Sequence, residues 1–90
     1  MNIIGEDIIK KIRELNFLKD QISNIDTTDQ IGISQNAILS LEIIDEIWEM
    51  VPNNKLRELI YSYVTYLDNE DFIKCHQVLE KINKIIDKNG

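Results

Sequence analysis

Cys75 and His76 are adjacent, and they are the residue types of a catalytic nucleophile and its general base. Such a pair needs both side chains within hydrogen-bond distance and a third group that orients the base. Successive residues on a helix point about 100° apart, so these two side chains would not face each other there. The chain has no second cysteine or histidine. We therefore expect Cys75 to be a packed thiol and His76 a packed or half-exposed structural residue.

Carboxylates are abundant, but their spacing matches no metal-binding or catalytic pattern. A di-iron bundle uses inward-facing glutamates and Glu-x-x-His pairs, and no Glu-x-x-His occurs here. Residues 68–71 (DNED) lack the twelve-residue spacing and the central glycine of an EF-hand calcium loop. Cys75 and His76 are two residues, whereas a structural zinc site takes four ligands. We expect no catalytic residue, no metal ion and no cofactor.

The charge pattern that stands out lies in LEIIDEIWEM, residues 41–50. On a helix, Glu42, Asp45, Glu46 and Glu49 share one arc of about 100°, opposite the apolar residues. Like charges at this spacing oppose one another by a few tenths of a kcal/mol per pair, roughly. No lysine or arginine lies in the same helix to relieve them. We name these four residues the acidic stripe.

The acidic stripe belongs to a longer segment without basic residues. Residues 20–54 contain seven acids and no lysine or arginine, and the net charge of the chain is −6 at pH 7. An acidic balance repels the phosphate backbone of nucleic acids. Direct nucleic-acid binding is therefore disfavoured.

Four helices are predicted to position these residues, and no strand pattern competes with them. Apolar residues recur every three or four positions, which is the helical period. The approximate ranges are 5–24, 35–51, 54–67 and 69–88. Short connections between successive helices favour antiparallel neighbours. We therefore predict an all-α fold, a compact antiparallel four-helix bundle of two helical hairpins, with residues 1–90 as one domain.

The start of the second helix is ambiguous. Thr27 and Gln30 have capping-box spacing and would start it near residue 28. That start would place Gly32 inside the helix and Ile31 on the acidic side. Ser34 as N-cap, with the helix starting near Gln35, is the better-patterned choice. Because apolar residues then cover about half of the circumference, we expect this helix to be the most buried element.

The other helix ends follow from single residues. Pro52 ends the second helix, and Asn53 or Asn54 caps the third. Asp68 is the expected N-cap of the fourth helix. The fourth helix also carries a basic side, complementary to the acidic stripe, formed by Lys74, Lys81, Lys84 and Lys88.

These features favour a protein that works by binding another protein rather than by catalysis. The expected partner has a basic surface, and the expected contact residues are the acidic stripe and Tyr61. Tyr61 lies toward the outer side of the third helix, four residues after Arg57, and protein interfaces favour this pair of residue types. The size and charge suit an inhibitor, an immunity protein or an adaptor.

Three other interpretations stay open. The acidic stripe and the basic side could simply be solvated surfaces. They could meet between two copies of the chain, giving a homodimer or a larger homo-oligomer. The bundle could also be a subunit or carrier that holds a small apolar molecule in its core.

The chain lacks a run of roughly 18 apolar residues that could cross a membrane, so we expect no membrane association. A single cysteine fits a reducing, cytoplasmic setting. Frequent Ile, Asn and Lys suggest an AT-rich bacterial or phage gene.

Overall fold

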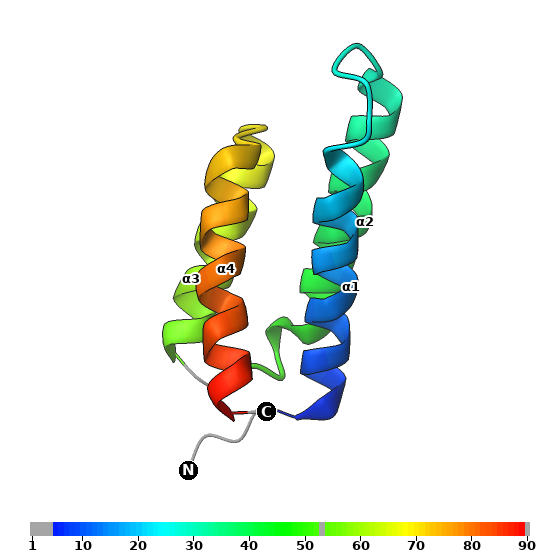
Figure 1. Cartoon of the computed structure of the whole chain (residues 1–90). Coiled ribbons are helices and arrows are strands. Elements are labelled where there is room, and N and C mark those ends of the chain that lie inside the picture. The colour runs from blue at the N-terminus through cyan, green and yellow to red at the C-terminus, as the bar shows by residue number, and fades with distance from the viewer. Residues whose placement is uncertain (1–4, 53, 90) are drawn as a thin grey trace.

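The computed structural model describes residues 5–52 and 54–89 and contains all four predicted helices. They are α1 (Glu6–Ile22), α2 (Gln30–Trp48), α3 (Asn54–Asp68) and α4 (Phe72–Asn89). The described residues contain no strand. Figure 1 shows α1 and α2 as one antiparallel hairpin and α3 and α4 as another. The predicted all-α, compact antiparallel four-helix bundle of two hairpins is therefore confirmed.

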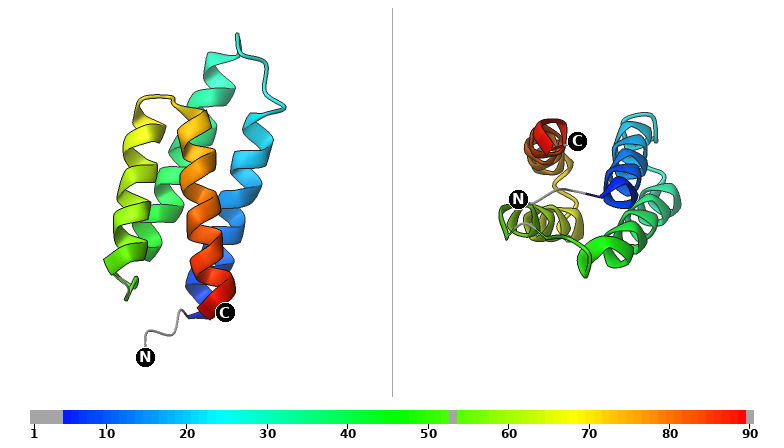
Figure 2. Two further views of the ribbon diagram at one scale, coloured as in Figure 1. Left: turned by 60° about the vertical axis from the view of Figure 1, so that its left-hand side comes forward. Right: turned by 90° about the horizontal axis from the view of Figure 1, so that it is seen from below.

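Each helix contacts two neighbours, as at the corners of a square. The closest packing is within the hairpins, and α2 against α3 and α1 against α4 then join one hairpin to the other. Among the described residues no Cα atom of α2 lies within 8 Å of one of α4, so these two helices occupy diagonal corners (Figure 2). The acidic stripe on α2 and the basic side of α4 consequently belong to opposite corners of the bundle.

The core is built from the predicted apolar faces. On α1 the buried residues are Ile8, Ile12, Leu15 and Leu18, at spacings of three and four. Burying a side chain of this size contributes about 1.5–3 kcal/mol relative to leaving it exposed. Ile4, which continues the same spacing toward the N-terminus, lies outside the described residues. The other helices and the α2–α3 connection add Ile44, Ile47, Val51, Leu56, Leu59, Ile60, Tyr63, Leu67, Cys75, Val78, Leu79, Ile82 and Ile86.

A reciprocal pair of amides joins the two hairpins. The Nδ2 atom of Asn16 donates to Oδ1 of Asn83 at 2.8 Å, and Nδ2 of Asn83 donates back to Oδ1 of Asn16 at 2.9 Å. Both residues are half-buried, and Asn16 also donates to the carbonyl of Ile12. If α1 slid along α4, both amides would lose these partners in a partly dry environment. The pair therefore favours one register of the two hairpins.

α2 starts earlier than predicted. It begins at Gln30, and the carboxylate of Asp29 accepts a hydrogen bond from the backbone N–H of Gly32 at 2.9 Å. The prediction of Ser34 as N-cap is wrong, because Asp29 supplies a better-placed side-chain acceptor for a free N–H group of the first turn. Gly32 lies inside the helix, and Ile31 is exposed on the outer side. α2 also ends at Trp48 rather than at residue 51.

The prediction that α2 is the most buried helix is wrong as well. Two of its four buried residues are polar: Asn36, which donates to the carbonyl of Leu18, and Ser40, which donates to the carbonyl of Asn36. The apolar arc of α2 is wider than its two neighbours can cover, and its first turn projects beyond the α3–α4 turn (Figure 1). The exposed apolar residues on α2 are Ile31, Ile38 and Leu39.

The α3–α4 connection also differs from the prediction. The N-cap of α4 is Asp71, whose carboxylate accepts from the backbone N–H of Lys74, and not Asp68. The chain leaves α3 through a Schellman turn, in which the N–H of Asp71 donates to the carbonyl of Tyr66 and Glu70 has a φ of 55°. Because of this left-handed conformation at Glu70, α4 begins at Phe72 rather than at the predicted residue 69. α3 begins at Asn54, in agreement with the predicted range 54–67. Asn53, one of the two predicted N-caps, lies outside the described residues.

Glu70→Gly is expected to stabilise the fold. A non-glycine residue in the left-handed region costs about 1–2 kcal/mol, and glycine removes most of that cost. We expect the free energy of unfolding to rise by about 1 kcal/mol in urea denaturation, with Tm higher by about 4–8 °C. The matched control is Glu58→Gly in the exposed interior of α3, which should lose about 1 kcal/mol. Equal destabilisation by both variants would contradict this explanation.

Candidate protein-binding face

The acidic stripe faces away from the core. Glu42, Asp45 and Glu46 are exposed on α2, and Glu49 is exposed as the residue that follows its last turn. Ile38, one turn before Glu42, and Ile31, about two turns before Ile38, lie on the same side and are also exposed. The outer side of α2 is therefore apolar near its start and acidic near its end.

One member of the stripe is paired across the hairpin. Nζ of Lys11 on α1 lies 2.7 Å from Oε2 of Glu46 and 3.6 Å from Oε2 of Glu14. The hydrogen bond to Glu46 is the main cause that raises the pKa of Lys11. Lys11 was not predicted as a partner of the acidic stripe, because only basic residues within α2 were considered from the sequence. Among the described residues, Glu42, Asp45 and Glu49 have no ion-pair partner.

Two exposed apolar side chains lie directly beside the acidic stripe. Phe17 on α1 is 62% exposed and Leu39 on α2 is 49% exposed. With Leu18 and Ile43 they line a shallow hollow of about 280 Å³, whose charged lining includes Glu42, Glu46, Glu14 and Lys11. We call Phe17, Leu39, Glu42 and Glu46, with Asp45 and Glu49, the α2 face. Phe17 was not singled out from sequence, although it falls outside the buried stripe of α1.

Tyr61 lies near the end of α2. It is 68% exposed and lines a second shallow hollow with Trp48, Arg57 and Glu58, as its position beside Arg57 suggested. Arg57 itself is occupied: Nε donates to the carbonyl of Val51 at 3.1 Å, and a terminal nitrogen donates to that of Trp48 at 2.9 Å. Its guanidinium also lies 4.9 Å from the centre of the Trp48 ring. Arg57 therefore caps the end of α2 and covers one side of Trp48.

Cys75 and His76 are separated as predicted. Cys75 is 2% exposed and its Sγ donates to the carbonyl of Tyr63 at 3.8 Å. Burial raises the pKa of the Cys75 thiol to about 11, so it is protonated at neutral pH and a poor nucleophile. His76 is half-exposed and pairs with Glu80, with Nε2 3.0 Å from Oε1. A thiol in the core and an imidazole at the surface do not form a catalytic pair.

Within residues 5–52 and 54–89, no three side chains from His, Cys, Asp and Glu converge in a way that could hold a metal ion. In this same part of the chain, every helix is too short or too polar to cross a membrane. Comparison with protein-family models, with curated proteins and with solved structures found no match. Function is therefore inferred from the surface of the molecule.

The buried thiol gives a test of reactivity. At pH 8 the native thiolate fraction should be about a hundredfold lower than in the unfolded chain, because the pKa is about 11 rather than 9.0. A thiol-specific disulfide reagent should therefore react slowly with the native protein and fast in concentrated urea. Since the unfolded thiol ionises first, the free energy of unfolding should also fall as pH rises from about 9 to about 11. A native thiol that reacts as fast as the unfolded one would contradict the packed assignment.

Proposed function

We propose that the chain is a protein-binding module whose α2 face docks on a basic surface of another protein. The observation that carries the proposal is the position of Phe17 and Leu39 beside Glu42 and Glu46. Protein interfaces commonly combine a desolvated apolar centre, often aromatic, with a polar rim. The α2 face has both parts on adjacent helices of one hairpin.

The charge of the α2 face adds to the argument. Glu42, Asp45 and Glu49 have no ion-pair partner among the described residues, and like charges held this close oppose one another. A basic partner would remove that repulsion, and charge complementarity of this kind chiefly raises the rate of association and the specificity. An inhibitor, immunity or adaptor role in a bacterial or phage cytoplasm fits such a face. Tyr61 and Trp48 are candidates for its margin.

Association of two copies is the second candidate. The acidic stripe on α2 and the basic side of α4 occupy diagonal corners, so one copy could present its α4 to the α2 of the next. Lys81, Lys84 and Lys88 are all exposed. Such a contact joins different surfaces and would extend into a ring or filament. This contact would be observed as self-association of the purified protein that weakens as the salt concentration rises.

The proposal is tested by reversing the unpaired charges. Glu42→Lys, Asp45→Lys and Glu49→Lys are combined in one variant, which leaves the Lys11–Glu46 pair intact. The control combines Asp7→Lys, Glu80→Lys and Asp87→Lys, which gives the same charge change on α1 and α4. We expect a partner captured from native cells by the wild type and the control, and binding by the α2 variant weaker by about tenfold or more.

The purified complex should also weaken as ionic strength rises, because salt screens charges at a partly exposed interface. A partner that binds the α2 variant as tightly as the wild type would place the interface elsewhere. An affinity independent of salt would contradict the electrostatic part of the proposal. Circular dichroism of both variants checks that each keeps its helices.

A further inference from the structure

A second apolar surface lies between the two hairpins, at the end of the molecule where α3 turns into α4. Two adjoining hollows of about 490 and 310 Å³ share Ile33 and Phe72. We call this surface the end groove. Its apolar lining comes from the end of α1, the α1–α2 loop, the first half of α2, the end of α3 and the start of α4. It includes Ile22, Ile25, Ile33, Ile38, Phe72 and Ile73.

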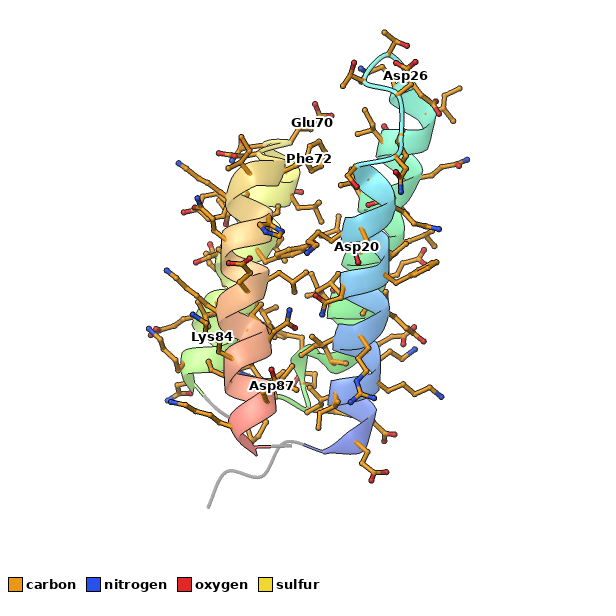
Figure 3. All side chains as sticks on the ribbon, viewed as in Figure 1. Asp20, Asp26, Glu70, Phe72, Lys84 and Asp87 are labelled. Carbon is orange, nitrogen blue, oxygen red and sulfur yellow. The ribbon has the colours of Figure 1, made fainter. Side chains whose placement is uncertain are left out.

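The end groove lies where the start of α2 projects beyond the α3–α4 turn (Figure 1). In Figure 3 the ring of Phe72 extends from the start of α4 toward the α1–α2 hairpin. Phe72 is only half-buried there, and Ile73 beside it is 76% exposed. A contiguous apolar groove is uncommon on a solvent-exposed protein surface. Grooves of this kind bind the apolar face of an amphipathic helix.

The charges around the end groove are acidic. Asp20, Asp68 and Glu70 line it, and Asp26 lies at the tip of the α1–α2 hairpin (Figure 3). Lys19 is the lysine in its lining, and Nζ of Lys19 lies 3.4 Å from the carboxylate of Asp20.

The other titratable groups close to the end groove are largely paired with one another. His76 pairs with Glu80, and Lys74 pairs with Asp71. Among the described residues, Asp26, Asp68 and Glu70 have no ion-pair partner. The groove therefore has an apolar floor and a negatively charged rim.

We propose that the end groove binds an amphipathic helix of a partner protein, with apolar residues on one side and lysine or arginine beside them. Apolar side chains at positions i, i+3 or i+4, and i+7 would enter the groove on either side of Phe72. The flanking cations would meet Asp68 and Glu70 on one side and Asp26 on the other. This site is independent of the α2 face.

The acidic rim disfavours a second copy of the chain as the occupant. Two copies placed groove to groove would bring one acidic rim against the other, and like charges at an interface are costly. A small apolar molecule would leave the rim charges unused. It would also lie partly in solvent, whereas small-ligand sites bury most of the ligand surface.

The test is selection from a display library of helical peptides about four turns long, with random residues, on the full chain. We expect the enriched peptides to be amphipathic, with lysine or arginine flanking the apolar positions. Ile73→Ser should weaken their binding by about tenfold, because the bound peptide would bury this exposed isoleucine. Ile31→Ser is the matched control, because Ile31 is 73% exposed but lines neither hollow, and it should leave binding unchanged.

Charge reversal at the rim gives a second readout. Asp68→Lys with Glu70→Lys should weaken the selected peptides and reduce the salt dependence of their binding. The inference is overturned if the enriched peptides carry acidic flanks, or if none loses affinity in Ile73→Ser. It is also overturned if Ile73→Ser weakens the binding of a fluorescent apolar dye, or of a second copy of the chain, but of no peptide.

Selected peptides that respond to the Glu42, Asp45 and Glu49 reversals but not to Ile73→Ser would belong to the α2 face. That result would overturn the end groove as a site and leave the proposed function standing. Dependence on Ile73 alone would support the end groove as a site, and the proposed function of the α2 face would still depend on its own test.

Discussion

The two hairpins meet over only part of their length, and the surface features follow from this constraint. Near the start of α1 and the end of α2, side chains such as Ile12, Ile47 and Leu56 interdigitate and exclude water. Toward the opposite end the α1–α2 loop and the start of α2 continue past the α3–α4 turn (Figure 1). Apolar residues there have fewer neighbours to pack against. One end of the bundle is therefore a conventional core, and the other is an open, partly apolar surface.

Polar interactions hold this arrangement in one register. The Asn16–Asn83 amide pair joins α1 to α4 between the hairpins, and Arg57 joins α3 to the carbonyls at the end of α2. Within the first hairpin, Asn36 donates to the carbonyl of Leu18. Each of these hydrogen bonds is directional and partly shielded from water, so a shift of one helix along another would leave polar groups without partners. Apolar contacts hold the bundle together, and these bonds restrict which contacts form.

Periodicity predicted the four helices and most of the core because a three- and four-residue spacing has one physical meaning on a helix. It did not predict the start of α2, which depends on how Asp29 reaches the N–H of Gly32. The exposure of Phe17 and Leu39, and the Lys11–Glu46 pair, depend on which helices become neighbours, and a helical wheel of one segment lacks that information. The groove at the open end was missed for the same reason, since it belongs to no single helix.

Amide hydrogen exchange along α2, measured on dilute protein, tests the unequal packing most directly. Exchange reports the free energy of local opening, which is highest where a helix is packed on both neighbours. Residues 41–48 should exchange slowly, close to the rate of global unfolding, and residues 30–36 should exchange faster by at least about tenfold. Uniform protection along all of α2 would contradict the account, because the open end would then be as well packed as the core.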